Sequence, residues 1–258
     1  MGEVSTIHLS RPSTHVALIE IDNPPMNALG RAARAALLAR LDEIDADPDV
    51  RAIILTGRGS RAFCGGDDLK EQAEAQASRS SAHLSEFGRV LERIEAHRLP
   101  VIAAINGWCL GGGLELASVC DIRIASTEAR FVCSGVNVGL IASAYRLPRL
   151  IGVARAKHML LTGSPVDAVT ADKFGLVTAV HAPDALTSEA VKLAERIASR
   201  APLSVEATKR TAALAPDLSP GEAAVVNAKE LAVLGRSADH RAALAAFAAK
   251  REPTFKRE

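Results

Sequence analysis

The chain has 258 residues, enough for one domain with an appendage, and a formal net charge of +1. This balance offers no basic surface for nucleic acid, and with 3% aromatic residues no stacking platform for bases is expected. No apolar run approaches the roughly 18 residues of a membrane-spanning helix, and no signal-peptide pattern opens the chain. Because the four cysteines lack metal-ligand spacing, we expect a cytoplasmic protein that binds no metal.

Short apolar strands alternate with helical segments from residue 4 to about 180, which is typical of an α/β fold. The strands expected from apolar, partly β-branched runs are Val16–Ile21, Val50–Leu55, Val101–Ile105, Ile122–Ala125 and Val177–Val180. Between the second and third of these strands, Leu84, Phe87, Leu91 and Ile94 recur at helical spacing. This segment is therefore predicted to be a helix that packs against the core.

A pair of acidic residues follows the glycine-rich stretch that comes after the second strand. The run from Ala62 to Leu69 reads AFCGGDDL. Taken alone, it is typical of an ordinary connection between a strand and a helix, in which Asp67 or Asp68 caps the helix.

A glycine triplet and a carboxylate come after the third predicted strand. After Val101–Ile105, the triplet 111–113 opens a short apolar segment that is expected to be a buried helix. Glu115 follows Gly112 by three residues, so it lies one turn along on the same side. A helix N-terminus with free N–H groups beside a carboxylate could stabilise an enolate and move its proton. The plainer alternative is a tight turn followed by a solvated glutamate.

The chain beyond about residue 186 is predicted to be helical throughout. The expected helices, separated by proline or glycine, are Leu186–Arg200, Ser204–Leu214, Glu222–Gly235 and Ser237–Lys250. A small-residue and aliphatic face that includes Val191, Ala194, Ile197 and Ala198 exceeds what a peripheral appendage needs. This face predicts self-association.

Together, the two glycine-rich segments resemble the signatures of the enoyl-CoA hydratase/isomerase (crotonase) superfamily, F-C-A-G-x-D-L and N-G-x-x-x-G-G-G-x-E-L. Family-like stretches at 21–30, 146–180 and 246–256 extend the resemblance over nearly the whole chain. The resemblance implies a crotonase-type ββα spiral over residues 1–185 that carries the active site. It also implies a helical oligomerisation region over 186–258, and a homotrimer or dimer of trimers.

The resemblance further implies the roles of individual residues. The thioester oxygen of an acyl-CoA would lie in an oxyanion hole formed by the backbone N–H groups of Asp67 and Gly112, with Glu115 as the acid/base. Coenzyme A would enter as part of the substrate, with no other cofactor. Contacts with substrate or coenzyme A are expected from Met26, Ala28, Leu29, Gly65, Gly66, Asp68, Leu69, Lys70, Gly111, Gly135 and Lys256.

Three features depart from the family pattern. The second glutamate of the hydratases, in an F-G-x-P-E stretch, is replaced here by Gly135. The loop from Gly139 to Arg146 is about three residues shorter than is common in the family. Asp67 places an acidic side chain at the oxyanion hole, where it could weaken the hole or supply a catalytic carboxylate.

Three functions therefore remain open from the sequence. The first is hydration of an enoyl-CoA, against which the missing second acid counts. The second is isomerisation or another reaction of the enolate that needs one acid, although isomerases of this family usually keep the acid that Gly135 replaces. The third is acyl-CoA binding without catalysis, against which the retained Glu115 counts.

Overall fold

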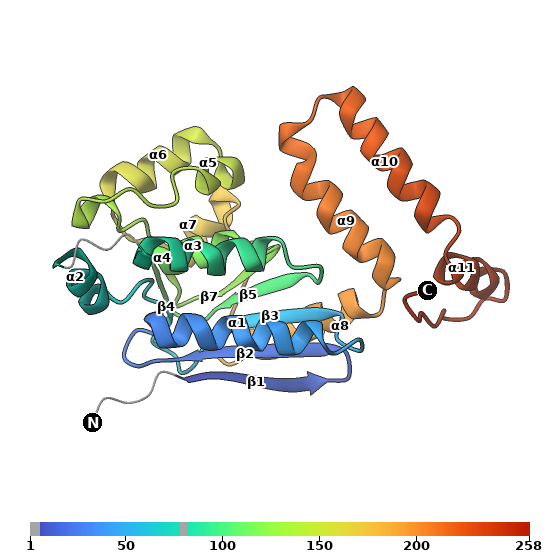
Figure 1. Ribbon diagram of the computed structural model, residues 1–258, viewed down its shortest axis with the longest axis horizontal. Coiled ribbons are helices and arrows are strands. Elements are labelled where there is room, and N and C mark those ends of the chain that lie inside the picture. Colours follow the sequence, from blue (N-terminus) through green and yellow to red (C-terminus); the bar gives the residue numbers. More distant parts are fainter. Residues whose placement is uncertain (1–5, 78–81) are drawn as a thin grey trace.

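The computed structural model describes residues 6–77 and 82–258, and within them a mixed sheet of six strands forms the centre (Figure 1). In sheet order the strands are β1 (Thr6–Ser13), β2 (Val16–Asp22), β3 (Ala52–Gly57), β5 (Val101–Ile105), β7 (Ile122–Ser126) and β10 (Ala179–His181). The pair β1–β2 is antiparallel and all later pairs are parallel. All five predicted strands are confirmed, one of them with the same bounds and the others with ends displaced by at most two residues; β1 was not predicted.

A second, smaller sheet carries the loops that matter most for function. Its strands, in sheet order, are β4 (Ala62–Cys64), β6 (Trp108–Leu110), β8 (Arg130–Val132) and β9 (Val166–Asp167). Each has only two or three residues, too few for an alternating pattern to appear in the sequence. This sheet therefore leaves no recognisable pattern in the sequence and was not predicted.

Helices cover both faces of the main sheet. On one face, α1 (Arg31–Asp45) and α3 (Ala82–Glu95) pack together and against the larger apolar core. In α3 the predicted core residues Phe87, Leu91 and Ile94 are buried, while the side chain of Leu84 lies outside the described part of the chain. On the other face lies α8 (Leu186–Ala198).

Helix α8 corrects one expectation about self-association. Ala194 is buried in a core cluster with residues of β2, β3, β5 and β7, and Val191 and Ile197 pack against that cluster. The face expected to contact other copies therefore packs on the sheet of its own chain. Alternation along the strands explains this, because every second side chain points to the α8 side.

Shorter helices complete the core part of the chain. They are α2 (Leu69–Ala77), α4 (Gly112–Ser118), the 3₁₀ helix η1 (Val136–Val138), α5 (Arg146–Ile151), α6 (Val153–Thr162) and α7 (Ala168–Phe174). The short buried helix predicted after the glycine triplet is α4, and it begins at the second glycine of the triplet.

The remaining helices extend away from the sheet (Figure 1). They are α9 (Pro202–Leu214), the 3₁₀ helix η2 (Ala215–Asp217), α10 (Pro220–Leu234) and α11 (Ala238–Ala248). The helical prediction is confirmed here, and α9 and α10 begin two residues earlier than expected because each starts with a proline at its first position. Large apolar side chains on the last two helices are exposed, among them Val225, Leu231, Val233, Leu244 and Phe247. Within the described ranges, no helix is long and apolar enough to cross a membrane.

Candidate active site

Three loops that leave the small sheet meet at one cavity. Strands β4, β6 and β8 are parallel, so the loops that follow them emerge from the same edge of the sheet. These loops, with parts of α2 and α3, surround a cavity of about 480 Å³. The predicted site residues that line it are Gly65, Asp67, Leu69, Gly111, Gly112, Glu115 and Gly135. The fold thus brings together the two signature segments, whose first residues, Phe63 and Asn106, are 43 positions apart in the sequence.

Glycines allow the first two loops to touch. A Cβ on Gly66, whose φ is +90°, would lie 2.7 Å from the backbone nitrogen of Gly112. A Cβ on Gly113 would lie 2.0 Å from the carbonyl oxygen of Cys64. Both contacts are with backbone atoms, which cannot move aside as a side chain end can. The close approach therefore requires glycine at both positions.

The N-terminus of α4 supplies a backbone donor at the cavity. Gly112 is the first residue of this helix, so its N–H has no acceptor within the helix itself. The positive end of the helix dipole lies at the same place, which favours an oxygen that carries negative charge. Asp67 lies on the adjacent loop and lines the same cavity.

The turn at residues 23–29 supports the loop that carries Asp67. The N–H of Leu29 donates to Gly66 O at 2.7 Å, and the N–H of Gly65 donates to Met26 O at 2.7 Å. The carbonyl of Ala28 accepts from the side-chain amide of Asn23 at 2.6 Å. Leu29 is completely buried, and neither it nor Met26 nor Ala28 lines the cavity. In this structure these three residues support the loop.

Glu115 lies one turn into α4 and faces the cavity. Its Oε1 accepts a hydrogen bond from the backbone N–H of Ser143 at 2.8 Å. Ser143 has φ of +59°, and it belongs to the short loop between η1 and α5. The shortened loop therefore delivers a donor that fixes the carboxylate of Glu115 in place.

Gly135 lies directly under the same loop. A Cβ at this position would lie 2.9 Å from both the nitrogen of Ala142 and the carbonyl oxygen of Leu140. The N–H of Leu140 also donates to Gly135 O at 2.8 Å, which holds the loop down. A longer side chain at 135 would require this backbone to move, so the loop occupies the space that a second acid would need.

The side chains of the two adjacent aspartates have different roles. Asp68 Oδ1 accepts from the N–H groups of Lys70 and Glu71 at 2.8 and 3.3 Å, which is the arrangement of a helix cap at the start of α2. Asp67 Oδ1 lies 2.5 Å from Nη1 of Arg34, which is only 2% exposed. Sequence reasoning missed Arg34. Arg34 precedes Leu37 and Leu41 by three and seven residues, and this helical spacing was the available signal.

The cysteines near the cavity are packing residues. Burial raises the pKa of the Cys64 and Cys133 thiols to about 12, so both stay protonated at neutral pH. A neutral thiol is a weak nucleophile. Among the residues that the structure describes, no group of three or more histidine, cysteine or acidic side chains could hold a metal ion.

Four other predicted residues lie outside the cavity lining, namely Gly66, Asp68, Lys70 and Lys256, and of these Asp68 is the helix cap described above. Gly66 packs against Gly112 behind the lining, and Lys70 is exposed on α2. Lys256 lies on the segment that follows α11. Its backbone N–H donates to Asp239 Oδ1 at 2.7 Å on the C-terminal segment, and that segment lies at the opposite end of the molecule from α2 (Figure 1). The chain does not fold back to bring Lys256 to its own cavity.

Comparison with known proteins agrees with this geometry. The family model described as enoyl-CoA hydratase/isomerase matches residues 11–258. An (E)-benzylidenesuccinyl-CoA hydratase of Thauera aromatica is 39% identical, over 95% of this chain and 96% of that protein. A crotonyl-CoA hydratase of Syntrophomonas wolfei is 34% identical, over 93% of this chain and 94% of that protein. The crystal structure of an enoyl-CoA hydratase from Bacillus anthracis superposes with a TM-score of 0.92 at 35% identity, covering 98% and 99% of the two chains. With its two glycine-rich loops, its buried helix N-terminus and this similarity along its length, the chain belongs to the enoyl-CoA hydratase/isomerase family and has the crotonase fold.

Proposed function

We propose that this protein hydrates a 2-enoyl-CoA, with the thioester oxygen between the N–H groups of Asp67 and Gly112 and with Glu115 as the acid/base. The observation that carries the proposal is the position of Glu115. Its carboxylate lines the same cavity as the N-terminus of α4, and a hydrogen bond from the Ser143 N–H orients it. A donor for an oxyanion and an oriented carboxylate are the two groups that enolate chemistry needs.

In the proposed reaction, Glu115 takes a proton from a water molecule while the oxygen of that water bonds to the β-carbon of the substrate. The electron pair of the double bond moves to the thioester, and negative charge develops on its oxygen. The two backbone N–H groups stabilise that charge by about 3 kcal/mol each, judged from other oxyanion holes. Glu115 then returns the proton to the α-carbon. The product is a 3-hydroxyacyl-CoA, and the carboxylate is regenerated.

Isomerisation of a 3-enoyl-CoA is the second candidate because it needs only one acid, although isomerases of the family usually keep the acid that Gly135 replaces. Because Leu140 and Ala142 occupy the space beside Gly135, a second acid has no room there. One carboxylate suffices to move a proton from the α-carbon to the γ-carbon through an enolate. Glu115 alone could perform this transfer.

The cavity walls suggest an apolar acyl group. Beyond Glu115 the lining is formed mainly by apolar side chains of α3, η1 and the following loop, including Phe87, Leu91, Val138 and Ile141. The relative from Thauera aromatica acts, by its name, on an acyl group with an aromatic ring. A substrate panel should therefore contain short, long and aryl-substituted 2-enoyl-CoA thioesters.

We also propose a homotrimer or a dimer of trimers. The exposed apolar side chains of α10 and α11 support this proposal, because a surface of this kind is unfavourable in water unless another molecule covers it. Leu231 and Phe247 are the most exposed of the group.

A set of three measurements tests the catalytic proposal. Hydration of crotonyl-CoA is followed by the loss of absorbance from the conjugated thioester, and isomerisation of a 3-enoyl-CoA by its gain. Calorimetry with a saturated acyl-CoA and with the free acid measures binding alone. Hydration supports the first candidate, and isomerisation without hydration supports the second. Binding with neither reaction indicates an acyl-CoA-binding protein, and equal affinity for acid and thioester contradicts all three.

A further inference from the structure

A buried arginine connects the elements that surround the proposed oxyanion hole. Arg34 lies on the core side of α1, where its neighbours Ala33 and Leu37 are completely buried. It is 2% exposed, although a guanidinium is strongly hydrated in water. Burial of such a group is unfavourable unless other charges and hydrogen-bond acceptors compensate it. The acceptors around Arg34 therefore indicate what it does.

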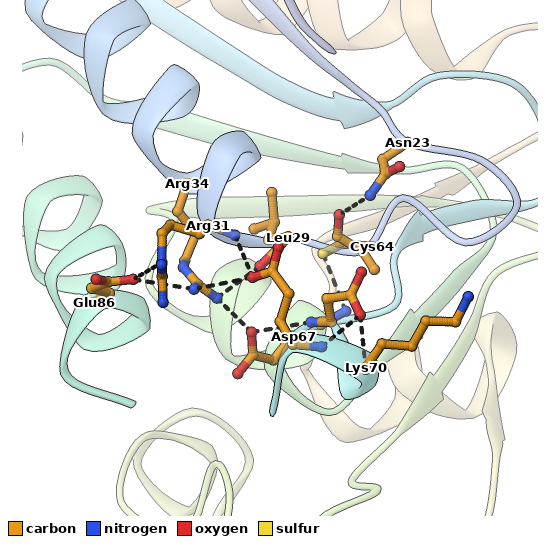
Figure 2. Close-up of polar contacts among 12 residues, drawn as sticks. Asn23, Leu29, Arg31, Arg34, Cys64, Asp67, Lys70 and Glu86 are labelled. Atoms are coloured by element: carbon orange, nitrogen blue, oxygen red, sulfur yellow. Dashed lines mark hydrogen bonds and ion pairs between the residues drawn. The ribbon is translucent and has the colours of Figure 1, made fainter. Parts of the chain in front are cut away.

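Those acceptors come from the loops and helices of the cavity (Figure 2). Nη1 donates to Asp67 Oδ1 at 2.5 Å and to the carbonyl oxygen of Leu29 at 2.9 Å. Nη2 donates to Glu86 Oε2 at 3.3 Å, and it lies 3.7 Å from Glu71 Oε2. One guanidinium thus contacts the loop after β4, α2 and α3, and all three elements line the cavity.

A second contact ties α2 to the beginning of α1. Glu71 Oε2 also accepts from the backbone N–H of Arg31 at 2.7 Å. This places the carboxylate at the positive end of the helix dipole of α1. A Cβ on Gly30 would lie 2.7 Å from Glu71 Oε1, so the helix start is also shaped to admit this side chain.

The contact with Asp67 is the one with chemical consequences. Asp67 contributes its backbone N–H to the proposed hole, but it also carries a carboxylate on the same residue. A negative charge beside a developing oxyanion opposes its formation. Asp67 Oδ1, however, faces Arg34 and also accepts from the N–H of Asp68 at 3.1 Å.

We propose that Arg34 is a positioning residue for the oxyanion hole. Its ion pair holds the carboxylate of Asp67 toward α1 and neutralises its charge, so that Asp67 acts through its backbone N–H. This inference rests on the proposed function, because it assumes that the thioester oxygen binds at Asp67 and Gly112. It also assigns the side chain of Asp67 to the support of the hole and leaves Glu115 as the acid/base.

A double-mutant cycle in the full-length protein tests the inference. The variants are Arg34→Met, Asp67→Ala and the combination of the two. Arg40→Met is the matched control, since Arg40 lies on the same helix and pairs with Glu43 on its surface. The readouts are kcat and KM, and the apparent pKa for enolisation of bound acetoacetyl-CoA. The enolate of this thioester has its own ultraviolet absorbance, and an oxyanion hole lowers that pKa without any turnover.

Arg34→Met should lower kcat about tenfold or more and raise the enolisation pKa by about one unit, since one unit is a tenfold change in equilibrium. In the Asp67→Ala background the same substitution should change either quantity less than about threefold, because the carboxylate on the residue that forms the hole is already gone. Arg40→Met should change neither. Equal effects of Arg34→Met in both backgrounds, or none in either, would overturn the inference.

Two further results separate failure of folding and failure of the proposed function. If Arg34→Met does not fold, Arg34→Lys keeps the charge but loses the forked contact with Asp67 and Glu86, and the same cycle is run with it. If the wild-type protein lowers the pKa of bound acetoacetyl-CoA but turns over no enoyl-CoA, the proposed reaction is wrong and the pKa cycle still decides the role of Arg34. If the wild-type protein does not lower that pKa, the hole is absent and both ideas are wrong.

Discussion

Replacement of Glu115 by glutamine tests the proposed catalytic acid most directly. The change removes the ability to take a proton and leaves the shape of the side chain unchanged. General acid/base groups contribute about 10²–10⁴ in rate. We therefore expect kcat with the best enoyl-CoA substrate to fall by that factor, which corresponds to about 3–5 kcal/mol in activation free energy. The measurement is steady-state kinetics across the substrate panel.

The geometry predicts that binding survives this substitution. Glutamine keeps an oxygen at Oε1, which can still accept from the Ser143 N–H that now lies 2.8 Å away. The proposed donors to the thioester oxygen are backbone groups of Asp67 and Gly112, and the substitution touches neither. The calorimetric Kd for a saturated acyl-CoA should therefore change less than about threefold, so that the loss appears in kcat.

A control and a competing variant complete this test. Glu95→Gln removes a different carboxylate, one that pairs with Arg146 at 2.7 Å at the end of α3, and it should leave kcat unchanged. Asp67→Ala removes the other carboxylate at the cavity and keeps the backbone donor. Full activity in Glu115→Gln together with loss of activity in Asp67→Ala would refute the assignment of Glu115.

Three further predictions concern packing, pH and assembly. Gly113→Ala should destabilise the fold by several kcal/mol in urea denaturation, because its Cβ would lie 2.0 Å from the carbonyl oxygen of Cys64. Gly221→Ala, which has open space around it in α10, should stabilise the fold by about 0.5–1 kcal/mol. Equal effects of the two substitutions would contradict the close contact between the two glycine-rich loops. Burial lowers the pKa of His97 from 6.5 to about 4, so the stability that its neutral form provides is complete above pH 6.5 and falls by about 3 kcal/mol as the pH drops to 4. His97→Gln should flatten that pH dependence of the unfolding free energy, and an unchanged slope would contradict the assignment. Light scattering should give the mass of a trimer or hexamer at micromolar concentration. Phe247→Ser, which replaces a side chain that is 84% exposed, should shift the protein toward the monomer. A monomeric wild-type protein would refute the proposed assembly.

Local patterns in the sequence were sufficient for much of the fold. The apolar strands 101–105 and 122–126, and the helical C-terminal region, follow from periodicity and from proline and glycine breaks. The two glycine-rich segments likewise located the cavity. Glu115 could be placed beside Gly112 because three residues make almost one helical turn, a relation that depends only on local geometry.

Contacts between distant segments were decided only by the tertiary structure. Strands of two or three residues in the small sheet gain their stability from neighbours far along the chain, so no local pattern marks them. The ion pair of Arg34 with Asp67 spans 33 residues, and whether a carboxylate near an oxyanion hole is free to act depends on that partner. In the same way, Gly135 appeared in the sequence only as the loss of an acid. The folded loop supplies the physical reason, because Leu140 and Ala142 occupy the volume that an acidic side chain would require.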